Sequence, residues 1–483
     1  MLSFRKRLIF LIALLCLCTG PLHTEAAFRV ESALLYNARP DGAARDNPAS
    51  GPFSIYDPGV WYRIDWRNYR AGVEYRYEWI APNGEIAHVY RNTRDSDSNG
   101  GSYARISSQR LYDHGPGAWK VRFYYDGALK QESGFEFKDP GDFTHLLYAP
   151  DFGNLEAGVI VAVHSSDYNP ITYFHMFREY AERKHMVLVA PYFPKETFHY
   201  QTIFRGTPRA DLHLKSILKE VYLKTGANTD RLYLYGKSAG AQFVHRYLLA
   251  YPETVARAVI AAPGYWTFPD EDSTFPYGLG HDRRVPEDVR FDIDRALQVP
   301  VMVVMGDGDV ERTENLNQSE RADAQGRNRL ERSLVWMNAM GRQAVLRGVP
   351  YRYHYHLEVG ADHGDLRGKT EERTMDFLFD INDNITVTPW NMSALFEPDE
   401  PRGARARAIV IQVGGQTKPV ALHAGPSPTD LRRYAHLSWR SIIFGYEAPL
   451  PFAVPNAGTI LYAQLEFADG SRSHLSGVRL IDR

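Results

Sequence analysis

Three patterns of hydrophobic and polar residues follow one another along the chain and predict three folded domains. From about residue 28 to residue 140 apolar and polar residues alternate, most clearly in residues 73–79. A period of two, broken by turn residues, predicts an antiparallel β-sandwich of about immunoglobulin size. Within this domain the polar stretch 94–101 indicates a mobile loop. The alternation returns after residue 383, for example in residues 408–413, and predicts a second β-sandwich over residues 384–483.

The pattern between about residues 141 and 383 is different, because unbroken apolar runs alternate with amphipathic helices. The apolar runs without a polar face are residues 159–163, 187–190, 232–235, 258–261 and 301–305. Strands that are apolar on both faces and separated by helices predict an α/β domain, whose parallel sheet is covered on both sides. In such sheets ligands bind at the carboxyl ends of the strands, so the chemistry of the chain is expected there.

The first 27 residues have the features of a signal peptide. Arg5, Lys6 and Arg7 precede an apolar stretch, and the small residues Ala26 and Ala27 suit cleavage by a signal peptidase. The apolar stretch is too short to act as a permanent membrane anchor. The sequence therefore predicts an exported protein, periplasmic or secreted from a bacterium, that is cleaved near Ala26 and Ala27.

Composition narrows the chemistry that the mature protein can use. Both cysteines, Cys16 and Cys18, lie in the predicted signal peptide, so no disulfide, thiol nucleophile or thiolate metal site is expected after cleavage. The net charge is −2 with no long run of one sign, which argues against nucleic acid or an acidic membrane surface as partner. Because no metal-ligand spacing or cofactor fingerprint stands out, we expect neither a metal nor a cofactor.

The strongest chemical signal is the motif Gly236-Lys237-Ser238-Ala239-Gly240, which directly follows an apolar run. A helix is predicted to begin at once, which is the strand–turn–helix context of a G-x-S-x-G nucleophile elbow. The two glycines are needed because the serine occupies a strained turn in which neighbouring side chains would clash. The motif predicts Ser238 as a nucleophile and the N–H of Ala239 as part of an oxyanion hole.

A serine nucleophile needs a base and an orienting acid, which in this fold follow it in the order acid, then histidine. The run 301–305 ends in Gly306-Asp307-Gly308-Asp309. We favour Asp309 as the acid because it lies farther along the loop, and Asp307 is the alternative, which could instead shape the turn. His363 follows the last predicted strand and is the predicted general base.

Three further segments could complete the site. The second oxyanion donor is expected at Ser165 or Ser166, in the loop after residues 159–163, whereas His164 stands outside the required order and is expected to shape the loop. The irregular, aromatic segment 266–289 is a natural wall or lid over the serine. The charged segment 311–332 indicates a solvated helix pair, or alternatively an Arg-lined pocket for an acidic acyl or sugar group.

Residues 229–240, with the sequence TDRLYLYGKSAG, resemble the corresponding block of bacterial polyhydroxyalkanoate depolymerases and feruloyl esterases. Those proteins are secreted α/β-hydrolases that act on ester bonds of polymers or plant cell walls. Residues 251–253 and 258–264 also resemble their next helix and strand, so the resemblance covers the middle domain, about half of the chain. In these families the acid follows a strand in a G-x-x-D pattern, which corresponds to residues 306–309 and implies Asp309. The early loop departs from them, because serine follows His164 where a His-Gly pair is usual.

The sequence thus predicts an α/β-hydrolase domain between two all-β domains. The predicted function is hydrolysis of carboxylic esters, polymeric or linked to polysaccharide, by a Ser-His-Asp triad through an acyl-enzyme. Two alternatives stay open: a serine peptidase of the prolyl-oligopeptidase type, although no propeller is evident, and an inactive hydrolase fold that binds carbohydrate or a surface. The aromatic residues Trp439, Phe444 and Tyr446 of the last domain could bind a polymer, although core packing is the commoner use of such residues.

Overall fold

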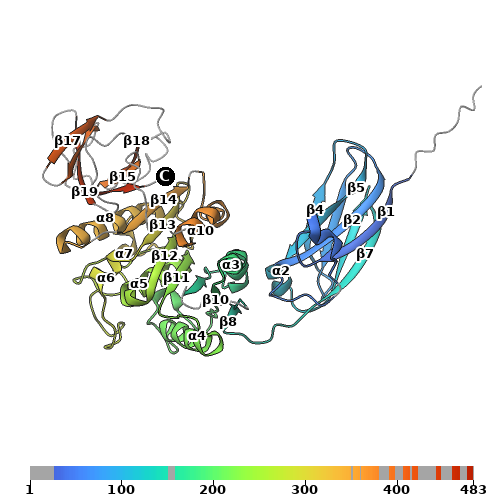
Figure 1. Cartoon of the computed structure of the whole chain (residues 1–483), viewed down its shortest axis with the longest axis horizontal. Coiled ribbons are helices and arrows are strands. Elements are labelled where there is room, and N and C mark those ends of the chain that lie inside the picture. Colours follow the sequence, from blue (N-terminus) through green and yellow to red (C-terminus); the bar gives the residue numbers. More distant parts are fainter. Residues whose placement is uncertain are drawn as a thin grey trace, which may run out of the picture. The chain divides into compact units, whose positions relative to one another are not determined.

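The computed structural model describes residues 27–49, 51–150, 158–349, 352–358 and 360–379, together with six strands between residues 391 and 481. The chain divides into two compact units, Met1–Gly141 and Asp142–Arg483 (Figure 1). The predicted signal peptide lies outside the described residues except for Ala27, and the predicted domain boundaries at residues 140 and 383 stay predictions. In the part of the chain that the structure describes, no helix has the length and apolar character needed to cross a membrane.

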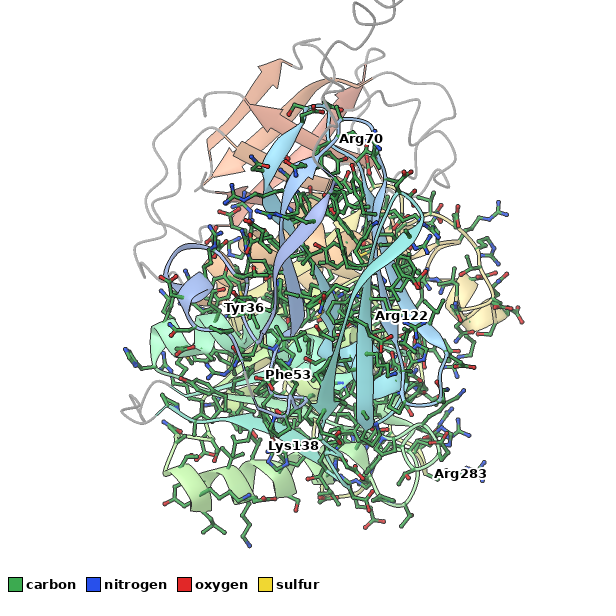
Figure 2. The ribbon with its side chains drawn as sticks, turned by 90° about the vertical axis from the view of Figure 1, so that its right-hand side faces the viewer. Tyr36, Phe53, Arg70, Arg122, Lys138 and Arg283 are labelled. Carbon is green, nitrogen blue, oxygen red and sulfur yellow. The ribbon has the colours of Figure 1, made fainter. Side chains whose placement is uncertain are left out.

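The first unit consists of two antiparallel sheets. One contains β1 (Arg29–Tyr36), β2 (Gly59–Tyr69) and β5 (Ser98–Ser107), and the other contains β3 (Tyr75–Ile80), β4 (Ile86–Asn92), β6 (Gly117–Tyr125) and β7 (Ala128–Phe137); the short helices are η1 (Gly42–Asp46) and α2 (Ser108–Asp113). The alternating side chains of the two sheets meet in an aromatic core, where Tyr62 of β2 lies edge-on to Tyr77 of β3 at 6.1 Å between ring centroids. Arg70 lies at one end of this unit, with Phe53 and Lys138 toward the other (Figure 2).

The prediction of a mobile loop at residues 94–101 is wrong for the second half of this stretch. Strand β5 begins at Ser98, and Gly100 and Gly101 pair with Trp66 and Asp65 of β2. A Cβ atom on Gly101 would collide with Asp65, so glycine allows the close approach of the two strands. Serine, asparagine and glycine are typical of loops, and only the pairing with β2 makes this stretch a strand.

The second unit is built on a seven-stranded sheet with the order β14-β13-β12-β11-β9-β10-β8. Its strands are β8 (His145–Tyr148), β9 (Val159–Val163), β10 (Val187–Pro191), β11 (Leu232–Lys237), β12 (Val255–Ala261), β13 (Val301–Gly306) and β14 (Tyr353–Glu358). All neighbouring strands are parallel except β8, which pairs antiparallel with β10. Strands β9, β10, β11 and β13 are buried along their whole length, which explains their unbroken apolar sequences.

Helices cover both faces of this sheet (Figure 1). On one face α3 (Pro170–Lys184) and α10 (Glu371–Phe379) contact each other, and on the other α6 (Ile293–Gln298) contacts both α5 (Ala239–Ala250) and α8 (Arg329–Arg347). The remaining helices are η3 (Tyr200–Thr202), α4 (Ala210–Thr225), η4 (Pro252–Thr254), α7 (Glu320–Asp323) and α9 (Leu366–Lys369). This mostly parallel sheet between two helical layers is the α/β architecture that the middle of the sequence predicts.

The last six strands form one antiparallel sheet with the order β17-β16-β19-β20-β15-β18. They are β15 (Asn391–Phe396), β16 (Ala406–Val413), β17 (Gln416–Ala421), β18 (Ile442–Glu447), β19 (Ile460–Phe467) and β20 (Ser476–Ile481), and α8 contacts β15 and β20. The β-sandwich expected over residues 384–483 stays a prediction. Trp439 lies outside the described residues, and the structure describes only the backbone of Phe444 and Tyr446.

Candidate active site

Ser238 occupies the turn between β11 and α5, at the carboxyl edge of the sheet. Its backbone has φ 54° and ψ −111°, a conformation that is strained for any residue with a side chain. The Ser238 N–H donates to the carbonyl oxygen of Ala261 at 2.8 Å, which ties the turn to the end of β12. The half-buried side chain thus stands at the N-terminus of α5, where the helix dipole favours negative charge.

The two glycines of the motif make this turn possible for steric reasons. A Cβ atom on Gly236 would collide with the carbonyl oxygen of Gly240. A Cβ atom on Gly240 would lie 2.5 Å from the carbonyl oxygens of Val163, the last residue of β9, and of His164, the first residue of the loop that follows. The elbow therefore closes on itself and packs against that loop only because both positions lack a side chain.

His363 lies between β14 and α9 and connects the other two predicted site residues. Its Nε2 is 3.1 Å from the Oγ of Ser238, and its Nδ1 is 2.7 Å from the Oδ2 of Asp309. Because an ionised carboxylate can only accept, Nδ1 carries the proton and Nε2 is left to accept from the serine hydroxyl. The structure thus brings Ser238, His363 and Asp309 together in one continuous chain of hydrogen bonds.

The two carboxylates after β13 have different partners. Asp309 is almost fully buried and contacts both His363 and Arg329. Asp307 accepts a hydrogen bond from the backbone N–H of Gly360 at 2.7 Å. The geometry therefore places Asp309 as the partner of the histidine and Asp307 as a residue that shapes the neighbouring loop.

The loop after β9 holds the predicted second oxyanion donor. Ser165 is buried and its carbonyl oxygen accepts a hydrogen bond from the N–H of Tyr168 at 3.0 Å, whereas Ser166 is exposed. Ala239 is the first residue of α5, and the N–H groups of a first helical turn have no acceptor within their own helix. The roles of Ala239, Ser165 and Ser166 in an oxyanion hole stay predictions.

The comparisons with known proteins can be set beside this geometry. No protein-family model matches the sequence, and no curated protein matches it. The fold is similar to that of poly(aspartic acid) hydrolase-1 from Sphingomonas sp. KT-1, with 21% sequence identity, 49% of this chain and 92% of that chain covered, and a TM-score of 0.42. A poly(3-hydroxybutyrate) depolymerase from Bordetella parapertussis is 26% identical, with 49% of this chain and 85% of that chain covered and a TM-score of 0.42. A thermostable esterase is 13% identical, with 68% of this chain and 97% of that chain covered and a TM-score of 0.39.

The matches to poly(aspartic acid) hydrolase-1 and to the depolymerase each cover about half of this chain. The matched structures include a depolymerase and an esterase, the kinds of protein that residues 229–240 resemble. The structure of this chain itself shows the seven-stranded sheet and the turn after β11 that carries Ser238. It also shows Asp309 after β13 and His363 after β14. 

His164, beside the elbow, is a buried structural residue. Its Nε2 accepts from the N–H of Phe193 at 3.0 Å, and its Nδ1 donates to the carbonyl oxygen of Ser165 at 2.8 Å. Burial lowers the pKa of His164 to about 4, so the ring is neutral near pH 7. The ring therefore links the loop after β9 to Phe193 in the loop after β10, and His164 shapes its loop as the sequence predicts.

The expectation of a solvated helix pair at residues 311–332 is wrong for the second half of that segment. The side chains of Arg329 and Arg332 are only 3% and 0% exposed. Arg332 donates to the carbonyl oxygen of Gly264 at 2.6 Å and to Asp323 at 2.9 Å, while Arg329 donates to Asp309. Both guanidinium groups are bound within the protein, so neither lines a pocket for an acidic ligand.

The irregular segment 266–289 is anchored firmly where it begins. Trp266 is buried and stacks on Trp336 of α8, with 4.0 Å between ring centroids. The side chain of Gln325 accepts from the backbone N–H of Trp266 at 2.9 Å and donates to its carbonyl oxygen at 2.8 Å. The first residues of the segment are thus a fixed part of the fold, and its role as a wall or lid stays a prediction.

Sequence reasoning missed Arg329 as a neighbour of the site. It is the first residue of α8 and lies in a segment rich in charged residues. A charged residue at a helix start is usually exposed, so no signal in the sequence separates this buried arginine from its solvated neighbours. Among the described residues, no group of three or more His, Cys, Asp or Glu side chains is placed to hold a metal ion.

Proposed function

We propose that this protein is a serine hydrolase that cleaves carboxylic ester bonds. The observation that carries the proposal is the hydrogen-bonded chain from Ser238 through His363 to Asp309, which joins a nucleophile, a base and an orienting acid. The strained backbone of Ser238 supports it, because such strain commonly accompanies a functional position.

In the first half of the reaction Ser238 Oγ attacks the ester carbonyl carbon while His363 Nε2 takes its proton. Asp309 holds the imidazole in the required tautomer and stabilises the imidazolium that forms. The N–H of Ala239, together with one from Ser165 or Ser166, binds the oxyanion of the tetrahedral intermediate. The imidazolium then gives its proton to the leaving oxygen, so that an alcohol departs and an acyl-enzyme remains.

In the second half a water molecule replaces the alcohol. His363 takes a proton from this water as it attacks the acyl carbonyl carbon, and the same oxyanion contacts stabilise the second intermediate. The proton returns to Ser238 Oγ as the acyl bond breaks, which releases the carboxylic acid and restores the enzyme. Apart from the ester and one water molecule, each step uses only side chains and backbone groups of this chain.

The substrate class that we propose is an ester of a polymer or of a polysaccharide, met outside the cytoplasm. The signal-peptide features of residues 1–27 support export, and the resemblance of residues 229–240 to depolymerases and feruloyl esterases supports such substrates. 

The proposal is tested by hydrolysis of short-chain p-nitrophenyl esters by the mature wild type and by Ser238→Ala. We expect turnover by the wild type and a loss of about 10⁵-fold or more in kcat for the variant, as disabling a triad member does. A fluorophosphonate probe should label the wild type at Ser238 and leave Ser238→Ala unlabelled.

Other results would contradict the proposal in distinct ways. Cleavage of peptide p-nitroanilides in preference to esters would indicate a peptidase. A wild type that is inert toward both substrates but binds insoluble polysaccharide would indicate a binding protein with a hydrolase fold. Equal ester hydrolysis by the wild type and Ser238→Ala would rule out this serine as the nucleophile.

A further inference from the structure

The carboxylate of Asp309 is shared between two partners. Its Oδ2 contacts His363 Nδ1 at 2.7 Å, and its Oδ1 accepts a hydrogen bond from Arg329 Nη1 at 3.1 Å. The side chains of Arg329 and Asp309 are 3% and 1% exposed, so this ion pair is shielded from water. A buried charge pair of this kind depends strongly on both partners, because losing one leaves the other uncompensated.

The start of α8 is built so that Arg329 is held in place. Asn328 precedes the helix and its Oδ1 accepts from the N–H of Glu331 at 2.9 Å, which is a helix N-cap. Glu331 reaches back and accepts from the N–H of Arg327 at 2.7 Å. Arg329 also donates through Nη2 to the carbonyl oxygen of Asn315 at 3.4 Å. Since α8 also packs against β13, the strand that leads to Asp309, the arginine and the aspartate are fixed relative to each other.

We propose that Arg329 is a positioning residue of the Ser238–His363–Asp309 site, which orients the Asp309 carboxylate and offsets its charge. This inference rests on the function proposed above. The terminal torsion of an aspartate is soft, so a hydrogen bond to Oδ1 keeps Oδ2 directed at the imidazole. The guanidinium also adds a fixed positive charge beside the place where the imidazolium forms. It therefore favours the neutral imidazole that must accept the proton of the serine.

Other charged groups surround the site and remain unchanged when Arg329 is replaced. Lys237 at the end of β11 has a pKa lowered by burial and by Arg367 of α9, and it also senses Asp167, Asp309 and Arg329. 

Besides Asp309, the loops that carry the acid and the histidine contain the carboxylates of Asp307, Glu311, Glu314, Asp362 and Asp365, of which Asp365 is paired with Lys369. Because these groups are present in all variants, a difference between Arg329→Met and the control variant Arg332→Met is assigned to the loss of the Arg329 guanidinium.

The test compares Arg329→Met and Arg329→Lys with Arg332→Met, using kcat and KM for a soluble p-nitrophenyl ester from about pH 5 to pH 9. Arg332 lies on the same helix, is equally buried and has no contact with Asp309, so it is the matched control. 

For Arg329→Met we expect kcat to fall by about 10- to 100-fold with little change in KM, because the base is less well oriented. The acid limb of its kcat/KM profile should move to higher pH by about one unit, because one positive charge within several ångströms of the imidazole is lost and the imidazolium becomes more favourable. Arg329→Lys should keep the wild-type acid limb, and Arg332→Met should keep both the limb and kcat.

The outcomes separate this inference from the proposed function. A wild type without esterase activity contradicts the proposed function. An active wild type together with a folded Arg329→Met variant of unchanged kcat and unchanged acid limb contradicts only the role of Arg329, as does an equal shift in Arg332→Met. If Arg329→Met does not fold, Arg329→Gln keeps a hydrogen-bond donor, removes the charge and must show the same shift of the acid limb.

Discussion

Asp307 accepts a hydrogen bond from the backbone N–H of Gly360 at 2.7 Å, so the first carboxylate after β13 holds the loop that leads to His363. Two residues later Asp309 contacts the imidazole itself. Gly306, just before Asp307, and Gly308, between the two carboxylates, lie close to the carbonyl oxygen of Ala361, and a Cβ atom on Gly306 would collide with it. The acid loop and the histidine loop are therefore fitted to each other, and the two carboxylates have separate tasks.

This separation predicts different effects of the two amide substitutions. Asp309→Asn should lower kcat by about 10⁴-fold, because an amide can stabilise the wrong imidazole tautomer. Asp307→Asn keeps an oxygen that can accept from Gly360 and should change kcat by less than about 10-fold. Steady-state hydrolysis of a p-nitrophenyl ester, with circular dichroism to verify folding, measures both. Equal losses in the two variants would show that the assignment of Asp309 is wrong.

Gly236→Ala and Gly240→Ala should both destabilise the second unit. Each new methyl group would meet fixed backbone atoms rather than flexible side chains. Overpacking of this kind costs about 1–3 kcal/mol, and the elbow would also have to shift. The control is Gly368→Ala in α9, where a Cβ atom meets nothing within 4 Å and alanine favours the helix. Urea unfolding measures the three free energies, and a Gly240→Ala midpoint equal to that of Gly368→Ala would contradict the steric argument.

The parallel strands of the second unit could be predicted because burial on both faces leaves a direct mark on the sequence. The sequences of strands β9 and β13 are unbroken apolar runs. The edge strand β8 was not predicted, because its four residues are only partly buried and carry no period. The first residues of β5 have the composition of a loop, and the sequence does not predict them as strand because their pairing with β2 depends on the tertiary structure.

The residues of the candidate site also differ in how far the sequence predicts them. Ser238, Asp309 and His363 were predicted from a motif and from their order at the ends of successive strands, and the structure places them in contact. The choice between Asp307 and Asp309 needs the positions of two loops relative to each other. Arg329 could not be found at all, because a sequence shows that a residue is charged but not that it is buried against another charge.

The stability of the protein should fall in mild acid, in part because of His164. Burial lowers its folded pKa to about 4 from an ordinary value of 6.5. A lowered histidine pKa means that the unfolded chain binds the proton more readily, so stability is present above pH 6.5 and is lost as the pH falls toward 4. For this ring the loss is about 3 kcal/mol between pH 7 and pH 4.

His164→Asn removes this titration, and its amide N–H can still donate to the carbonyl oxygen of Ser165 in place of Nδ1, while its shorter side chain gives up the contact with Phe193. The free energy of unfolding of the variant should therefore depend less steeply on pH between about 6.5 and 4, as measured by urea unfolding across that range. Wild type and variant both retain other histidines whose pKa is lowered by burial, including His245, so the test is the difference between the two slopes. Identical slopes would show that His164 is protonated in the folded protein as readily as in the unfolded chain.

The anchoring of the segment 266–289 can be tested at Gln325, whose amide satisfies both backbone groups of the buried Trp266. Gln325→Leu should cost about 2–4 kcal/mol, because a buried N–H and a buried C=O lose their partners together. Amide hydrogen exchange at Trp266 and Thr267 should accelerate in the variant. Gln318→Leu is the control, since the exposed Gln318 bonds only at the surface, and its exchange should match that of the wild type. If Gln325→Leu also exchanged at the wild-type rate, the Gln325 amide would not be what holds the start of the segment.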